Sequence, residues 1–516
     1  MANRTVFTRT PDVPGPGDYP TALWNAQRAK YWEYWNHFDG GWLDDTISES
    51  DTTPKYPLQL NPYNMACLLH AGFLFGEVGD GNDPLVSAVI EPWGRDSTQE
   101  QREQAARLTD LVNRVWYENS GRALQQEAGL ISQILGGCIF GVAYDPTLEA
   151  EGRLPIRIDH VLPEYFFPVP SPTQYWQLLE LFIAFEVTKL QANRMYGLAS
   201  LYDNALYQEW WKPDSYEITV EGQPVSWGGI PLSGRPLGGR IPYTYIPHIR
   251  AGEFYGISLL DRKLALAEEI NERMADVGDI VSENARVLPT IMNTSKVTVR
   301  RLSSGMVVLD LGRATPGTDA PDIKYPTDTQ PGAATVQWAT DLLNIARTEA
   351  YTPPVCYGLD EGSQRSGLTL ALRMIPLLVH IRQERTYWTS GMNHTARMIL
   401  EVAAEKGIEG IAPEMLRNNR VWQEWAPVLP RDHEALVNEL ILRLNSGLIA
   451  PETALERLGD MRDIQTELNL IKAWMEYKAK VNLNAQMQNP FGGAGSGGEQ
   501  AGLSRPNEPQ PTLKEK

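Results

Sequence analysis

An unbroken helical pattern runs through YGISLLDRKLALAEEINERMADVGDIVSENARVLP, residues 255–289. Its apolar side chains recur at three- and four-residue steps, the period of one face of an α-helix, and Pro289 ends the pattern. The stretch therefore predicts a helix of over 25 residues, longer than most helices in globular proteins. The apolar face consists of Leu259, Leu260, Leu264, Leu266, Ile270, Met274, Val277, Ile280 and Val281.

A small β region follows this helix, and a second helix follows the β region. Residues 289–326 contain four short runs with strand character, PTIMNT, KVTVRRL, GMVVLDL and DIKYP, separated by Ser, Gly and Pro turns. Residues 333–351 return to a helical period and stop before Pro353 and Pro354. Two long helices that flank a short β region are expected to lie side by side.

The residues before the long helix predict an α+β region. Residues 1–20 are rich in Pro and Gly and are expected to form a flexible arm. Asn61 is a good N-cap and Pro62 a good first helical residue, so a helix is predicted over 61–77. The remaining pattern predicts helices at 98–119 and 122–137, strands at 138–146, 154–163 and through 181–220, and a hairpin at 217–227.

The helix predicted over 21–38 carries an aromatic stripe at three- and four-residue spacing. The stripe consists of Trp24, Tyr31, Trp32, Trp35 and Phe38. A platform for stacked bases would interleave aromatic with basic side chains, and only Arg28 and Lys30 are present here. Packing on a core is therefore the favoured interpretation.

A very long helical pattern occupies residues 368–407 and contains Pro376. Proline removes one backbone hydrogen bond and its ring clashes with the carbonyl four residues earlier. A kink is therefore predicted at Pro376.

The C-terminal part predicts a small helical region followed by a tail. Residues 432–459 form two helical patterns, separated by a stop at Ser446-Gly447, with Pro451 opening the second. Residues 463–482 form a third. The chain from Asn489 has few apolar residues, and the tail is predicted to be disordered.

The composition limits the classes of partner. The formal net charge is −18 and the isoelectric point is about 5.0, whereas proteins that hold nucleic acid statically are usually basic. An acidic chain still suits DNA that must slide past it. The three cysteines are far apart and form no CxxC, which favours a reducing compartment. The first residues lack the apolar core of a signal peptide, and no segment has the length and hydropathy of a membrane span.

The stretch GSQRSGLT, residues 362–369, differs by one residue from a phosphate-binding P-loop. Leu368 stands where the lysine that meets the phosphates is required, and Asp360 and Glu361 would repel phosphate. Nucleotide binding is therefore not expected. The segment is interpreted as a glycine-framed loop between two long helices.

No catalytic or metal-binding motif is recognisable. The seven histidines include no HExxH, and His380 and His394 share a helical pattern but are 14 residues apart, too far to share a metal ion. There is no G-x-S-x-G, and adjacent acids such as Asp44-Asp45 are common in any acidic chain. We therefore predict no enzyme activity, no metal and no cofactor.

The order of these elements resembles the portal protein of tailed double-stranded DNA phages, and the resemblance covers roughly residues 21–484. FYGISLLDRKLALAEEINERMADVGDIV resembles the stem helix of portals, RSGLTLALRMIPLL the start of the helix after the tunnel loop, and LILRLNSGLIAPETALERLG the helix pair of the crown. Thr369 stands where the family usually has Ala. Ala450 stands where Ser or Thr would cap a helix, a loss of about 1 kcal/mol that Pro451 partly offsets.

The resemblance implies a predominantly helical α+β portal fold. Its regions would be a flexible arm (1–20), an α/β wing (21–254), a stem helix (255–288), a β clip (289–332), a second stem helix (333–351) and a tunnel loop (352–367). A kinked wing helix and return (368–430), a helical crown (431–484) and a disordered tail (485–516) would follow.

The resemblance also implies a function: a homo-oligomeric ring, typically of twelve subunits, at one vertex of the capsid. Double-stranded DNA would pass through its channel during packaging, retention and ejection. The terminase motor, the head-tail adaptor, and the major capsid and scaffolding proteins would be its partners, with no membrane involved. The ring would assemble in the host cytoplasm and reside in the virion.

The tunnel loop is the site that the resemblance places against DNA. Asp360 and Glu361 would keep DNA from binding tightly, and a ring of Arg365 side chains would make transient phosphate contacts. The DNA-facing residues would be Val355, Cys356, Tyr357, Gly358, Leu359, Asp360, Glu361, Gly362, Ser363, Gln364 and Arg365. Two alternatives remain open, an intracellular glycosidase-like hydrolase that uses two carboxylates, and a virion structural protein other than the portal.

Overall fold

The computed structural model describes residues 21–41, 60–76, 84–94, 97–174, 176–199, 203–285, 290–292, 298–301, 307–310, 322–324, 333–359, 371–429, 433–458 and 464–487. The chain divides into two compact units, Met1–Pro430 and Arg431–Lys516. Both helices and strands build the first unit, whereas only helices are described in the second. The fold is therefore of the mixed α and β class.

Helices of the first unit begin where the sequence supplies caps. The side chain of Asn61 accepts a hydrogen bond from the Asn64 N–H and Pro62 is the first helical residue, as predicted. Thr98 and Gln101 form a reciprocal capping box. The helices are α1 (Thr21–Asp39), α3 (Pro62–Phe75), α4 (Gln99–Glu118), α5 (Gly121–Leu135), α6 (Lys189–Tyr196), α7 (Leu264–Ala285), α8 (Ala333–Glu349) and α10 (Ile375–Lys406).

Antiparallel sheets accompany these helices. One has the order β12-β2-β3, with β2 (Gly137–Tyr144), β3 (Ile156–Val161) and β12 (Tyr243–Pro247). A larger one has the order β11-β7-β6-β5-β4, with β4 (Phe166–Pro170), β5 (Leu178–Thr188), β6 (Asn204–Trp211), β7 (Tyr216–Val220) and β11 (Ser233–Gly234), and β8 (Gln223–Pro224) also pairs with β7. The third pairs β1 (Ser87–Pro92) with β17 (Asn419–Glu424), and a short ribbon joins β9 (Ser226–Trp227) to β10 (Ile230–Pro231).

The main core lies where α3, α4 and α10 meet the β12-β2-β3 sheet. Trp388 of α10 packs edge-on against Phe75 of α3 and Phe140 of β2, and Phe140 also packs against Trp116 of α4. All four rings are almost completely buried. Burial of large aromatic side chains is the main favourable term in such a core.

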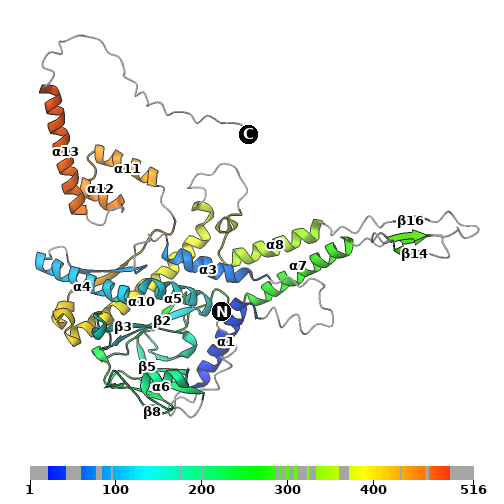
Figure 1. Ribbon diagram of the computed structural model, residues 1–516, viewed down its shortest axis with the longest axis horizontal. Coiled ribbons are helices and arrows are strands. Elements are labelled where there is room, and N and C mark those ends of the chain that lie inside the picture. Colours follow the sequence, from blue (N-terminus) through cyan, green and yellow to red (C-terminus); the bar gives the residue numbers. More distant parts are fainter. Residues whose placement is uncertain are drawn as a thin grey trace, which may run out of the picture. The chain divides into compact units, whose positions relative to one another are not determined.

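The helices α7 and α8 lie side by side (Figure 1). Ala267 and Ile270, near the start of α7, share one buried cluster with Leu342 and Ala346 of α8. The cluster also holds Tyr31 of α1 and Ile134 of α5, so it fixes the start of α7 and the end of α8 to the rest of the unit. The two helices are therefore antiparallel, as the sequence predicted.

The first part of the predicted long helix is not helical. Its start was expected at residue 255, but α7 begins at Leu264. The Leu259 N–H donates to the carbonyl of Gln133, and Ser258 Oγ donates to the carbonyl of Ile134. These bonds to α5 replace the helical ladder, so the apolar side chains of Leu259 and Leu260 belong to the core and not to a helix face.

Four short strands lie between α7 and α8, at the positions that the sequence predicted. β13 (Thr290–Met292) pairs with β16 (Asp322–Lys324), and β14 (Thr298–Arg301) pairs with β15 (Val307–Asp310). Both pairs are antiparallel.

Two local predictions are corrected. A strand pattern was expected through 181–220, but α6 interrupts it, opened by a capping box of Thr188 and Gln191. In the aromatic stripe of α1, Trp32 is 55% exposed, and Tyr34 takes the inward position and donates a hydrogen bond to Asp261. A polar partner on a neighbouring segment therefore helps to set which ring of this helix turns inward.

The long helical pattern after residue 368 is interrupted at Met374. Residues 371–373 are helical, and α10 begins at Ile375 with Pro376 in its first turn. A proline there removes no helical hydrogen bond because the first N–H groups of a helix have no partner within it. The break therefore precedes Pro376 by two residues.

The second unit consists of α11 (His433–Asn445), α12 (Pro451–Leu458) and α13 (Ile464–Met487). Gly447 adopts positive φ after α11 and Pro451 opens α12, as predicted. The third helix extends five residues beyond its predicted end at 482.

Candidate functional site

The predicted tunnel loop begins as a well-anchored turn. Residues Pro354–Tyr357 form one 3₁₀ turn that ends at Gly358, which has positive φ. Val355 and Cys356 pack against the main core, and the Tyr357 hydroxyl lies 2.9 Å from Thr352 Oγ1. Gly358 and Leu359 are the exposed residues at the end of this turn.

The DNA-facing residues predicted from sequence thus fall into three groups, of which the exposed Gly358 and Leu359 are the first. Val355, Cys356 and Tyr357 are half-buried, so each has contacts within its own chain. Asp360, Glu361, Gly362, Ser363, Gln364 and Arg365 lie outside the described residues, as does the rest of the P-loop-like stretch.

A buried polar cluster lies beneath the start of the loop. Tyr351 stacks on the ring of His380, with 4.5 Å between ring centroids. His70 of α3 packs edge-on against the same ring, and its Nε2–H donates to the carbonyl of Ala350 at 2.8 Å. The cluster therefore joins the end of α8 to α3 and α10.

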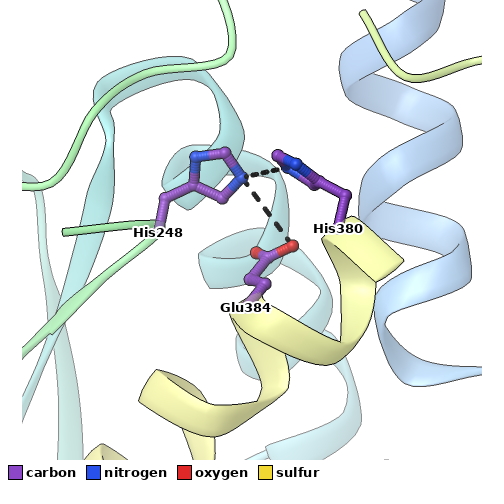
Figure 2. Close-up of side chains that lie close together, drawn as sticks. All are labelled: His248, His380 and Glu384. Carbon is purple, nitrogen blue, oxygen red and sulfur yellow. Dashed lines mark hydrogen bonds and ion pairs between the residues drawn. The ribbon is translucent and has the colours of Figure 1, made fainter. Parts of the chain in front are cut away.

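Three potential metal ligands converge in this cluster. His380 and Glu384 project from adjacent turns of α10 toward His248, which follows β12 (Figure 2). The Nε2 atoms of His248 and His380 are 3.0 Å apart, and Glu384 Oε2 is 3.8 Å from His248 Nε2. One ligand atom from each residue lies within 4.8 Å of the others, and all three residues are buried.

Neighbouring groups hold these side chains in place. His248 Nδ1 is 2.7 Å from the carbonyl of Ile257. Since a carbonyl only accepts, Nδ1 carries the proton and Nε2 of a neutral His248 carries the lone pair. On Glu384, Oε1 accepts from Gln133 Nε2 at 2.5 Å and from Ser132 Oγ at 3.1 Å.

Burial makes every member of the cluster neutral near pH 7. It lowers the pKa of His248 to about 4 and that of His380 to about 2, and the His70 pKa is lowered to about 3. Burial also raises the pKa of Glu384 to about 8. The contact between His248 and Glu384 is therefore a pair of neutral groups and not an ion pair.

Sequence reasoning missed this cluster. His248 and His380 are 132 positions apart, and no local spacing connects them. The one available signal was His380 and Glu384 at i and i+4, which places both on one face of a helix. The sequence analysis compared His380 only with His394 on the same helical pattern, and that comparison could not reveal a ligand from another element.

One family model matches most of this chain. Among the helices of the described residues, none is long and apolar enough to cross a membrane. A search of curated proteins finds no match. The family model for phage portal proteins of the SPP1 Gp6-like type matches residues 95–480, well over half of the chain, and this family is structural, not catalytic. The order of elements and this match together place the chain in the phage portal protein family.

Proposed function

We propose that this protein assembles into a closed ring whose central channel conducts double-stranded DNA into and out of the capsid. The observation that carries the proposal is the antiparallel pair α7 and α8, joined by short strands, within a chain of the portal family. In this arrangement α7 and α8 are the stem, residues 289–332 the clip, and residues 21–254 the wing. The proposed ring has twelve subunits.

Exposed apolar stripes support assembly with further copies of the chain. On α11 and the turn after it, Val437, Ile441, Leu444 and Leu448 recur at three- and four-residue steps and are 37–74% exposed. Leu470, Trp474 and Tyr477 form a second stripe on α13 and are 58–67% exposed. Apolar surface of this kind favours burial against a partner. A second copy suits it because every copy in a ring presents the same stripes.

The net charge supports passage of DNA and argues against its static capture. A chain with formal net charge −18 repels phosphate, and a ring of such chains repels it more strongly. We propose that residues 354–357 anchor the tunnel loop and that the channel-facing part begins at Gly358. Asp360 and Glu361 would weaken DNA binding, and Arg365 would supply brief phosphate contacts.

The proposed location is the portal vertex of the virion, after assembly in the host cytoplasm. The clip would receive the terminase motor during packaging and the head-tail adaptor afterwards. The major capsid and scaffolding proteins would surround the wing. Nucleotide hydrolysis would belong to the motor, so the ring itself would have no catalytic role.

Electron microscopy of the purified full-length protein tests the proposal. We expect class averages of closed rings with an open axial channel, and light scattering should give a mass of many chains. A stable 57.8 kDa monomer would contradict ring assembly. Rings without a continuous channel would instead indicate another structural role in the virion.

A further inference from the structure

His248, His380 and Glu384 offer three ligand atoms from two elements that are distant in sequence. We propose that they bind a divalent transition metal ion of the zinc class, one in each chain. The inference goes beyond the portal role and does not depend on ring formation. Its basis is the position of the three ligand atoms, the tautomer of His248 and the absence of a hydrogen bond at Glu384 Oε2.

His248 meets the first requirement, which is a nitrogen lone pair that faces the cluster, and His380 supplies a second when its Nε2 proton moves to Nδ1 or is released. The Ile257 carbonyl holds the proton of His248 on Nδ1, so its Nε2 faces the cluster as an acceptor. A hydrogen bond from the other ring nitrogen to a backbone carbonyl is the usual support for a metal-binding histidine. The 3.0 Å between the Nε2 atoms of His248 and His380 is short enough for one ion to contact both.

Glu384 meets the second requirement, which is a buried carboxyl oxygen near the same point that becomes anionic when a cation displaces its proton. Its side chain is 0% exposed, and Oε2 forms no hydrogen bond of good geometry, although the Trp388 side chain lies near the carboxyl group. A buried carboxylate oxygen without a partner is costly, and a cation removes that cost. Gln133 and Ser132 bind the other oxygen and so hold the carboxyl group in one orientation.

The donor set points to the class of metal. Two imidazole nitrogens and one carboxylate oxygen suit zinc and neighbouring first-row ions, whereas calcium and magnesium prefer oxygen ligands alone. Three protein ligands leave a fourth tetrahedral position for a water molecule. The Gln133 amide binds the other oxygen of Glu384, and its own Oε1 is buried without a hydrogen bond.

The ion would link the segment after β12 to α10, and a third element, the end of α8, contacts one of the ligands. His248 leads from β12 toward α7, whereas His380 and Glu384 belong to the helix that follows the loop. Tyr351, at the end of α8, stacks on His380. Metal binding would therefore stiffen the contact between α10 and the end of α8, just before the proposed tunnel loop begins.

The same side-chain positions also suit a cluster without a metal ion, and an experiment can distinguish the two. In the cluster without the ion, His380 Nε2–H donates to His248 Nε2, and Glu384 is protonated. The test is to strip the purified full-length protein with a chelator and then to add Zn²⁺ or Co²⁺. We expect uptake of about one ion per chain, a raised Tm, and the visible absorption bands of tetrahedral Co²⁺.

Variants make the test specific. Glu384→Gln keeps the shape but lacks the charge, and His248→Ala lacks one ligand, so each should lower the affinity for Zn²⁺ at least about tenfold. His394→Ala is the matched control, because His394 lies on the same helix, outside the cluster. The measurement on the wild-type protein does not depend on whether the variants fold. If the wild type takes up none of Zn²⁺, Co²⁺, Ni²⁺ and Mn²⁺, the proposal is overturned. Equal uptake by the wild type and both cluster variants would overturn it as well.

Discussion

At the scale of single residues, the contact between α10 and β12 depends on a glycine. A Cβ atom built on Gly391 would lie 2.3 Å from Cγ1 of Ile246, which is fully buried in the middle of β12. Real Cβ atoms do not approach other atoms so closely, so the helix or the strand would have to move. The absent side chain therefore sets how closely the helix approaches the sheet.

We expect Gly391→Ala to destabilise the protein by about 1–3 kcal/mol, because an added methyl group overpacks this contact. Thermal unfolding of the purified protein measures the effect. Gly72→Ala is the matched control, since it also changes a helical glycine but nothing lies within 4 Å of the new Cβ. The control should be neutral or stabilising by up to about 1 kcal/mol. Equal Tm values for both variants would contradict the close packing.

A buried histidine on α1 gives the protein a predictable sensitivity to acid. His37 is 2% exposed, and burial, helped by the charge of Lys263, lowers its pKa from 6.5 to about 4. Between pH 6.5 and about 4, His37 therefore binds a proton in the unfolded chain but not in the folded chain. The resulting stabilisation is complete above pH 6.5 and is lost as the pH falls toward about 4.

We expect His37→Phe to reduce this loss, because phenylalanine binds no proton and keeps a ring beside Tyr63. The gain relative to wild type should reach at most about 3 kcal/mol at the acid end of the window. Tm values of both proteins, measured across the window at one protein concentration, test the sign. A wild-type Tm that falls no more than that of the variant would contradict the assignment.

At the scale of elements, the start of α7 shows where sequence reasoning succeeded and where it could not. Caps and periodicity predicted α3, α4, α5 and the four strands between α7 and α8, because those signals are local. Residues 255–263 carry the same apolar period but form hydrogen bonds with α5, which is more than 100 residues earlier. Periodicity does not reveal whether a leucine belongs to the apolar face of a helix or to a non-helical segment buried in the core. The His248, His380 and Glu384 cluster was missed for the same reason.

Ser258 is the residue that holds this non-helical start. Its Oγ donates to the carbonyl of Ile134 at 2.6 Å and accepts from the Leu260 N–H at 3.0 Å, and the residue is 3% exposed. Ser258→Ala should cost about 1–3 kcal/mol, because two buried backbone groups lose their partner. Thermal unfolding checks this, with the exposed Ser215→Ala as the control. Equal Tm values for both would mean that Ser258 does not hold the segment.

The tunnel loop offers a test of function at the same scale. Replacing Gly362 and Gly367 with Val, or deleting residues 360–364, changes the proposed channel-facing part and leaves the anchored turn at Pro354–Tyr357 intact. We expect rings of unchanged thermal stability and a sharp fall in DNA packaging in a reconstituted system. Failure to form rings would identify the loop as structural, and normal packaging would show that it does not face the channel.

At the scale of the whole molecule, a single chain leaves much apolar surface uncovered. The stripes on α11 and α13 belong to helices of ordinary amphipathic pattern, in which the apolar face normally meets a core. In the second unit, Leu440 and Leu468 are buried in this way. The exposed stripes therefore support the assembly of several copies that we propose.

We expect Trp474→Glu to weaken ring assembly markedly while leaving the chain folded, because its 58% exposed ring would be replaced by a charge within the proposed contact. Lys472→Gln, on the opposite face of the same helix, changes the net charge equally and should assemble normally. Mass photometry at several protein concentrations compares the two. Unchanged assembly of the tryptophan variant would show that this stripe is not a contact between copies.

The fixed end of the α7 and α8 pair has a mechanical consequence. The pair is attached at the start of α7 and at the end of α8, through apolar contacts and bonds to the backbone carbonyls of Gln133, Ile134 and Ala350. The 22 residues of α7 then form a lever arm of about 33 Å. A pull on the strands at its far end produces a torque at the attachment, just beside His70 and Tyr351. Most of this attachment is apolar or buried, so salt screens it little, and force applied at one end of the pair still reaches the start of the proposed tunnel loop at high ionic strength.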